Sequence, residues 1–199
     1  MKPIGVLALQ GDFLKHIQVL EEVGAETVQV RDVENLRSIG GLIIPGGEST
    51  TISKMLRRWN LMEPIIKLVR SGLPVFGTCA GLILLADELV NWNHLPRIGG
   101  LNLIVTRNAY GRQIDSFEAQ LEIDISGGPT LSSFTGVFIR APRIESNGLG
   151  AEVEVLSSFE GFPVLVRQKT ILAASFHPEL SGDVRLHSWF LEYMVEKSN

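Results

Sequence analysis

The sequence predicts an α/β fold in which helices flank a doubly wound, mostly parallel sheet. In the first half of the chain, short apolar runs alternate with amphipathic stretches, which is the order of βαβα units. These runs are apolar at consecutive positions, as strands buried on both faces of a parallel sheet are. The length of 199 residues, with 45% hydrophobic and 20% charged residues, is that of an ordinary globular domain. We therefore expect residues 1–199 to form a single domain.

Four buried strands are expected in the first half of the chain. Most are short apolar runs, and none is long enough to show a helical period. The expected strands are Ile4–Leu9, Glu26–Val30, Gly41–Pro45 and the PVFGTC segment Pro74–Cys79.

Amphipathic helices are expected between and after these strands. In the first helix, apolar residues recur at helical spacing from Phe13 to Val23, with Asp12 placed to cap the N-terminus and Gly24 to end the helix. The others are expected from near Ser49 through Leu56, over Met62–Arg70, and over residues 80–89 (AGLILLADEL) behind the fourth strand.

The second half of the chain has a different pattern, with short strand-like segments separated by Gly, Pro and Ser turns. We interpret them as antiparallel extensions and hairpins on the sheet, because no linker separates them from the first half. The segments are GLNLIVT (100–106), EAQLEID (118–124), TGVFIRA (135–141), EVEVLSS (152–158) and FPVLVRQ (162–168), followed by a buried strand ILAASF (171–176) and a closing helix over 183–196.

The composition argues against several classes of function. The net charge is −4 and there is no run of lysines or arginines, which argues against binding to nucleic acid or to a membrane surface. No apolar run is long enough to span a membrane, and the one near the N-terminus is too short for a signal peptide. A single cysteine rules out an internal disulfide and a multi-thiolate zinc site. We therefore expect a soluble, cytoplasmic protein.

The single cysteine, Cys79, lies in the pattern Gly77-Thr78-Cys79-Ala80-Gly81. A lone cysteine is more often a small buried hydrophobe than a nucleophile. Here, however, it follows a buried strand and precedes a helix, and the flanking glycines give the spacing of a nucleophile elbow. A sharp turn of this kind exposes the thiol at the N-terminus of the helix, where the thiolate is favoured. The position therefore favours a nucleophilic Cys79.

A nucleophilic cysteine needs a base, and the chain contains four histidines. His16 and His187 fall in expected helices and are interpreted as solvated or internally satisfied, and His94 as a surface residue. His177 follows a buried strand, so it is expected at the same sheet edge as the cysteine. Glu179, two residues later, is placed to orient His177 and to stabilise its imidazolium.

A pair of glycines, Gly46 and Gly47, follows the third expected strand in the segment IIPGGEST. Paired glycines allow the backbone to approach a ligand and to point its N–H groups at it, so this loop and the Ala80 N–H are expected to form an oxyanion pocket. A phosphate-binding loop is the alternative, but the spacing and the lysine of that motif are absent and Glu48 would repel phosphate.

Six motifs together resemble a known family. In chain order they are LALQGDF, PGGESTTI, FGTCAGLILLA, RNAYGRQIDSFEA, GVFIRAPRI and SFHPEL, and they span nearly the whole chain. The chain resembles the class I glutamine amidotransferases, and more narrowly the glutaminase subunits of pyridoxal 5′-phosphate synthases. The segments 91–100 and 145–152 match none of the family's motifs and are expected to be surface loops.

The resemblance implies a flavodoxin-like fold and a glutaminase that needs no cofactor and no metal. It implies that the enzyme hydrolyses L-glutamine to L-glutamate and ammonia through a Cys79 thioester, and that the ammonia passes to a synthase subunit in a hetero-oligomeric complex. It also implies a role for each matched residue: Cys79 as nucleophile, His177 as base, Glu179 as its partner, and Gly47, Glu48, Ser49, Arg107, Ile139 and Arg140 as glutamine-binding residues.

Two other functions remain open at this point. The chain could be the glutaminase of another amidotransferase, such as that of histidine biosynthesis, with the same chemistry and a different ammonia acceptor. It could also be a non-enzymatic redox-sensing or chaperone-like protein of the same architecture. That second class would not need the His177-Pro178-Glu179 segment.

Overall fold

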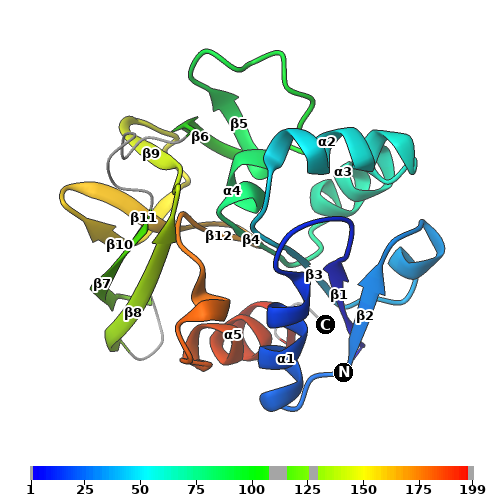
Figure 1. The fold of residues 1–199 in the computed structure, drawn as a ribbon, viewed down its shortest axis with the longest axis horizontal. Coiled ribbons are helices and arrows are strands. Elements are labelled where there is room, and N and C mark those ends of the chain that lie inside the picture. Colours follow the sequence, from blue (N-terminus) through cyan, green and yellow to red (C-terminus); the bar gives the residue numbers. More distant parts are fainter. Residues whose placement is uncertain (1, 108–115, 126–129, 197–199) are drawn as a thin grey trace.

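A seven-stranded sheet forms the centre of the protein in the computed structural model, which describes residues 2–107, 116–125 and 130–196 (Figure 1). Five strands are parallel: β1 (Ile4–Leu7), β2 (Thr27–Val30), β3 (Gly41–Ile44), β4 (Val75–Thr78) and β12 (Ile171–Ala174). Two antiparallel strands, β11 (Phe162–Gln168) and β10 (Glu154–Phe159), extend the edge beside β12. The order is β10-β11-β12-β4-β3-β1-β2, so the expected doubly wound, mostly parallel sheet is confirmed.

The helices cover both faces of this sheet (Figure 1). On one face lie α1 (Phe13–Glu22) and α5 (Arg185–Trp189), and α5 continues as a π-helical segment, Phe190–Val195. On the other face lie α2 (Ser49–Arg58), α3 (Met62–Arg70) and α4 (Ala80–Leu85). Short 3₁₀ turns occupy Glu34–Leu36 and Pro178–Leu180. None of the described helices is long and apolar enough to cross a bilayer.

Alternating side chains of the central strands build two cores. In β3, Leu42 and Ile44 pack under α2, α3 and α4, whereas Ile43 between them packs under α1 and α5. All three side chains are fully buried, which explains why this strand is apolar at consecutive positions.

The strand register brings three loops to one edge of the sheet. Ile44 pairs with Gly77 in β4, and Thr78 pairs with Ala174 in β12. The segments that follow these strands therefore start side by side at the carboxyl edge, where open parallel sheets bind ligands.

The expected helix over 80–89 is wrong in its second half. α4 ends at Leu85, and Ala86–Leu89 form strand β5. The backbone carbonyls of Ala86 and Asp87 accept hydrogen bonds from the Arg97 guanidinium (3.1 and 2.6 Å). The extended chain therefore satisfies these groups through a side chain distant in sequence, which helical periodicity cannot show.

The expected surface loop at 145–152 is also wrong over most of its length. Residues Arg143–Leu149 form strand β9, which pairs with β6 (Leu101–Thr106), and β6 in turn pairs in parallel with β5. The sequence of β9 is polar because most of its side chains are not buried. The strand depends on hydrogen bonds to β6, so its own composition does not identify it.

The expected antiparallel additions extend the central sheet only through β10 and β11. Strands β7 (Ser116–Ile123) and β8 (Leu131–Ile139) form a separate two-stranded hairpin, and β5, β6 and β9 form a separate three-stranded sheet. The hairpin packs by its face, since Phe134 and Phe138 contact Phe176 just beyond β12. Its apolar side chains thus join the core without edge pairing to the sheet.

Candidate active site

Cys79 occupies a sharp turn between β4 and α4. Its backbone has φ 48° and ψ −99°, a conformation rarely adopted by residues other than glycine. The flanking glycines are sterically required: a Cβ at Gly81 would lie 2.1 Å from the Ile44 carbonyl oxygen, and one at Gly77 would lie 2.8 Å from the backbone carbonyl carbon of Gly81. The glycine spacing in the sequence therefore reflects close backbone packing around a strained turn.

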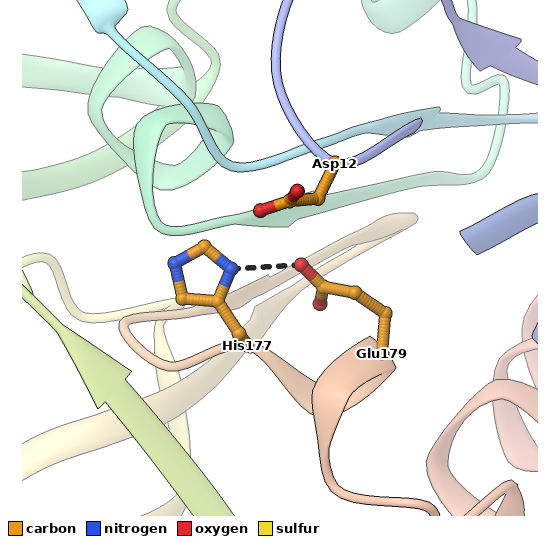
Figure 2. Close-up of side chains that lie close together, drawn as sticks. All are labelled: Asp12, His177 and Glu179. Carbon is orange, nitrogen blue, oxygen red and sulfur yellow. Dashed lines mark hydrogen bonds and ion pairs between the residues drawn. The ribbon is translucent and has the colours of Figure 1, made fainter. Parts of the chain in front are cut away.

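His177 is held by several neighbours at the end of β12. Its N–H donates to the Val137 carbonyl of β8 (2.8 Å), and its ring lies against Gly46, where a Cβ would come within 2.3 Å of Cε1. Its Nδ1 lies 2.7 Å from Oε1 of Glu179, the bond drawn in Figure 2. Glu179 lies in the 3₁₀ turn Pro178–Leu180, and from there its carboxylate reaches the ring.

The environment of the pair favours an ion pair. Burial lowers the pKa of His177, but hydrogen bonding to Cys79 and Glu179 and their negative charges outweigh it and raise this pKa to about 10. Burial likewise raises the pKa of Glu179, but the His16 and His177 rings outweigh it and hold this pKa below its ordinary value. Glu179 is therefore ionised beside a ring that readily accepts a proton.

A pocket of about 330 Å³ opens over Cys79 and His177. Most of the residues predicted from the sequence line it: Cys79, His177, Gly47, Glu48, Ser49, Arg107, Ile139 and Arg140. The other three predicted residues lie behind its wall: Gly46 beneath the His177 ring, Ala80 as the first residue of α4, and Glu179 behind His177. A larger hollow of about 750 Å³ beside α2 contains neither the cysteine nor His177. Residues 108–115 of the motif RNAYGRQIDSFEA lie outside the described residues.

Glu48 and Arg107 place opposite charges in this pocket. The Glu48 carboxylate caps α2 by accepting from the N–H groups of Thr50 (3.1 Å) and Thr51 (2.8 Å). Burial raises the pKa of Glu48, but these bonds and those from the threonine hydroxyls outweigh it and lower the pKa to about 2. Arg107 donates to Glu48 (3.3 Å), while its Nε and Nη1 have no hydrogen-bond partner among the described residues. A ligand carboxylate bound at one edge of the guanidinium would satisfy one of them.

The glycine loop rests on the loop after β1. The Asp12 N–H donates to the Gly46 carbonyl (3.3 Å), and the Glu48 N–H donates to the side-chain oxygen of Gln10 (2.8 Å). A Cβ at Gly11 would lie 1.8 Å from the Gly46 oxygen, so the two loops pack backbone to backbone. Gln10 was not predicted as a site residue, although its place directly after the first buried strand puts it at the same sheet edge.

The expected cap at Asp12 is wrong, because the Asp12 side chain makes no capping hydrogen bond at the N-terminus of α1. Its carboxylate faces the His177 ring instead (Figure 2). Asp12, His177 and Glu179 each offer an atom within 4.8 Å of the others, which is a conceivable donor set for a divalent cation. However, Nδ1 of His177 and Oε1 of Glu179 are already bonded to each other at 2.7 Å. A cation bound through these two atoms would have to break that bond.

Two histidines interpreted as solvated or internally satisfied lie directly behind the site. His16 and His187 are fully buried, and Nε2 of His16 is 3.3 Å from Oε2 of Glu179. The burial of His16 could have been predicted from the sequence, because His16 lies four residues before Leu20 and therefore on the same buried face of α1. Its contact with Glu179, 163 positions away by their residue numbers, could not be inferred from that spacing.

Known proteins resemble this chain over nearly its whole length. A family model described as the SNO glutamine amidotransferase family matches residues 6–196. The pyridoxal 5′-phosphate synthase subunit PdxT of Pelotomaculum thermopropionicum is 55% identical over 192 residues, or 96% of this chain and 95% of the relative. A crystal structure of a glutamine amidotransferase is 51% identical, with a TM-score of 0.88 over 95% of this chain and 97% of that one. PurLQS from Thermotoga maritima, at 16% identity and a TM-score of 0.70 over 100% of both chains, shares the fold alone.

Proposed function

Because this chain belongs to the SNO glutamine amidotransferase family, we propose that Cys79, His177 and Glu179 form the triad of its glutaminase activity. The chain is the glutaminase subunit of a pyridoxal 5′-phosphate synthase and hydrolyses L-glutamine to L-glutamate and ammonia. The observation that carries the triad is the 2.7 Å bond between His177 and Glu179, in a pocket that also exposes the strained Cys79 turn.

The reaction follows from the positions of these groups. The Cys79 thiolate attacks the side-chain amide carbon of glutamine, and the resulting tetrahedral intermediate expels ammonia as His177 gives a proton to the leaving nitrogen. Water then attacks the thioester, with His177 taking its proton, and glutamate leaves as the thiolate is restored. Glu179 stabilises the imidazolium during both halves of this cycle.

The oxyanion of the intermediate requires hydrogen-bond donors, and we assign this role to the backbone of Gly46, Gly47 and Ala80. Each such donor contributes about 3 kcal/mol to transition-state stabilisation. Gly47 has φ 151°, in the range that favours glycine, and Ala80 is the first residue of α4, where N–H groups lack helical partners.

The amino-acid end of glutamine carries both a carboxylate and an ammonium group. We assign the carboxylate to Arg107, which lines the pocket and has two nitrogens without a hydrogen-bond partner among the described residues, and we place Arg140 and Ile139 in the same pocket wall. The ammonium group is assigned to the side of Glu48 and Ser49. Opposed charges in one pocket select a zwitterion over a simple amide.

The ammonia produced here needs protection from water, because free ammonia is largely protonated near neutral pH and then has no nucleophilic lone pair. We therefore propose that the chain works in a hetero-oligomeric complex with a synthase subunit that takes up ammonia directly. The names of the curated relatives, which are subunits of pyridoxal 5′-phosphate synthase, support this partner over the one used in histidine biosynthesis. A redox sensor without activity would have no use for the bonded His177-Glu179 pair.

The test measures ammonia release from glutamine with and without the synthase subunit of the same organism. The wild-type chain should release ammonia in the complex, and an electrophilic glutamine analogue should label Cys79 stoichiometrically. Cys79→Ala should remain folded and bind the synthase but lose turnover by about a thousandfold or more. Substantial turnover by the Cys79→Ala variant would exclude the triad, and oxidation of Cys79 without any ammonia release would favour the redox alternative.

A further inference from the structure

Four buried side chains form a continuous line that ends at the proposed base, His177. His187 Nε2 lies 3.0 Å from His16 Nδ1, His16 Nε2 lies 3.3 Å from Glu179 Oε2, and Glu179 Oε1 lies 2.7 Å from His177 Nδ1. The exposed fraction is 0% for His16 and His187 and 4% for Glu179 and His177. The line joins α5 and α1 to the segment after β12.

Hydrogen-bonding chemistry fixes the direction of this line. An ionised carboxylate can only accept, so the Nε2 of His16 that faces Glu179 must carry its proton. In neutral His16 the Nδ1 is then an acceptor, and the neighbouring His187 Nε2 must donate to it. His187 Nδ1 is left as a bare lone pair, and it has no hydrogen-bond partner among the described residues. Nδ1 is thus both the unprotonated nitrogen of His187 in this assignment and the nitrogen of that ring without a partner among the described residues.

Both histidines remain neutral in this arrangement. Burial lowers the pKa of His187 to about 3, and the neighbouring His16 lowers it further against the effect of Glu179. Burial also lowers the pKa of His16, with Glu179 and Asp12 opposing this shift and His177 adding to it. The Nε2 of a neutral His16 lies 3.3 Å from Oε2 of Glu179 without neutralising its charge, and its hydrogen bond is made to the Thr78 hydroxyl (3.2 Å). The full negative charge of Glu179 therefore remains available to the His177 imidazolium.

The second oxygen of Glu179, Oε2, is buried and has no hydrogen-bond partner among the described residues. A carboxylate bonded through one oxygen can rotate about its last side-chain torsion, which has a broad energy profile. The His16 Nε2 lies 3.3 Å from Oε2, so its N–H opposes the rotation by electrostatic attraction and not by an aligned hydrogen bond. His16 Nε2 also lies 3.2 Å from the hydroxyl of Thr78, the residue before Cys79, so one ring contacts the segments that carry both ends of the triad.

We propose that His16 is a positioning residue of the glutaminase site, holding the plane of the Glu179 carboxylate with a neutral Nε2–H while His187 fixes that tautomer. This inference rests on the proposed triad and adds two members behind it. Because the attraction between the His16 N–H and the second oxygen helps to hold the carboxylate in the plane that orients His177, loss of this N–H should lower the rate of the chemical steps and leave glutamine binding intact.

The first test uses the wild-type protein, in which nothing is altered. Long-range ¹H–¹⁵N correlation spectra of the histidine rings distinguish the two neutral tautomers and the imidazolium. At pH 7.5 we expect both His16 and His187 to be neutral and protonated at Nε2. An Nδ1-protonated His16, or a cationic one, would overturn the proposal whatever the variants do.

The second test compares two amide substitutions that differ in reach. In His16→Gln the terminal amide can occupy the place of Nε2 and donate to Glu179, whereas in His16→Asn it reaches only the place of Nδ1. We expect His16→Asn to lower kcat about 10- to 100-fold with KM within twofold of wild type, and His16→Gln to recover most of the loss. Gln18→Asn, on the exposed face of the same helix, controls for the lower helix propensity of Asn.

Each outcome of this comparison is decisive. Wild-type kcat in a folded His16→Asn would refute the positioning role, and an equal loss in His16→Gln and His16→Asn would assign His16 to packing alone. If His16→Asn does not fold, His187→Leu takes its place: it leaves Glu179 untouched, and we expect a mixture of His16 tautomers and a several-fold lower kcat. Ammonia release by the wild-type complex is measured in parallel. Its absence would refute the proposed function, which is a different result from normal activity in the variants.

Discussion

At the scale of single residues, the His177 ring is constrained on several sides. Gly46 lies under it, Glu179 is bonded to its Nδ1, and its backbone is tied to Val137 of the hairpin. Orientation of the imidazole is therefore imposed by the fold before any substrate arrives. Preorganisation of this kind lowers the barrier because no group has to be reoriented during the reaction.

The two partners of Cys79 should differ in how much they contribute. His177→Ala removes the proton carrier, and we expect kcat to fall by about 10⁴-fold or more. Glu179→Gln keeps the shape of the side chain but places an amide N–H₂ group opposite the N–H of His177 or of His16. One of these contacts then has two donors facing each other. We expect a smaller loss of kcat, of about 10²- to 10⁴-fold. The measurement is steady-state ammonia release in the complex. His94→Ala, at an exposed position, is the control, and a larger loss there would mean that another base is at work.

Glu48 should influence both substrate binding and stability, because its carboxylate caps α2 and also meets Arg107. We expect Glu48→Ala to raise KM for glutamine and to lower the free energy of unfolding by about 1 kcal/mol through loss of the cap. Glu48→Gln retains an acceptor oxygen for the cap but no charge, so it should raise KM with a smaller loss of stability. The measurements are KM and urea unfolding of each variant. An unchanged KM in both variants would remove Glu48 from the glutamine site.

At the scale of elements, the glycine loop after β3 is a packing surface for the catalytic ring. The φ of Gly46 is not positive, so the need for glycine there is steric. A Cβ added at this position would have the atoms of the His177 imidazole as its nearest neighbours. Any side chain there must displace the ring.

We therefore expect Gly46→Ala to lower kcat by at least about tenfold, since small displacements of a catalytic group have large kinetic effects. Gly182→Ala is the matched control: its φ of 72° makes alanine strained, but no atom lies within 4 Å of the added Cβ. That control should lose stability by about 1 kcal/mol and keep its kcat. The comparison requires both kcat and unfolding curves. Equal kcat values for the two variants would show that the ring tolerates the added methyl group.

The elements differ in how far their sequences determine them. The buried strands and the helices α2 and α3 could be predicted, because their apolar spacing and their glycine ends are local properties. β5 and β9 could not, since the first depends on Arg97 and the second on pairing with β6. Both strands depend on contacts with residues elsewhere in the chain, and the local pattern of polar and apolar residues does not reveal such contacts.

The same distinction applies to the candidate site. The elbow at Cys79, the pair His177-Glu179 and the glycine loop could be placed from the sequence because each follows a recognisable buried strand. Gln10, Asp12 and His16 were not recognised as site residues, since their partners lie on other segments of the chain. The glycine spacing around Cys79 is a distinctive local pattern, whereas a buried histidine on an amphipathic helix has the same pattern as an ordinary core residue.

At the scale of the whole molecule, the central sheet gathers parts of the site from both ends of the chain. The loop after β1 and the segment after β12 meet over Cys79, so the pocket exists only when the complete sheet has formed. That residues 1–199 form one domain remains a prediction. It is supported by β10 and β11, which join the second half of the chain to the central sheet.

The buried histidines should make the stability of the whole molecule depend on pH. In the folded state the pKa of His187 is about 3, against an ordinary value of 6.5, because burial disfavours its charged form. Between these two values the unfolded chain binds a proton that the folded chain does not. The free energy of unfolding therefore falls as the pH is lowered below 6.5, by up to about 1.4 kcal/mol per pH unit for this residue. The lowered pKa of His16 acts in the same direction.

His177 acts in the opposite direction above neutrality. Its pKa is raised to about 10, so the stability it contributes is fully present below pH 6.5 and is lost as the pH rises through 10. Together these groups predict a maximum of stability near pH 6.5, with a decline on the acid side that His187 and His16 cause and one on the alkaline side that His177 causes.

Replacing His187 by phenylalanine should remove one acid-side contribution, because the variant has no imidazole to protonate when it unfolds. Between pH 7.5 and pH 5 we expect the wild type to lose about 2 kcal/mol more stability than His187→Phe, with the larger residue lowering stability at both values by a similar amount. Urea unfolding at the two pH values gives this difference directly, and His94→Phe, at an exposed position, should leave the wild-type difference unchanged. If His187→Phe keeps the full pH dependence of the wild type, then His187 is not held neutral in the core.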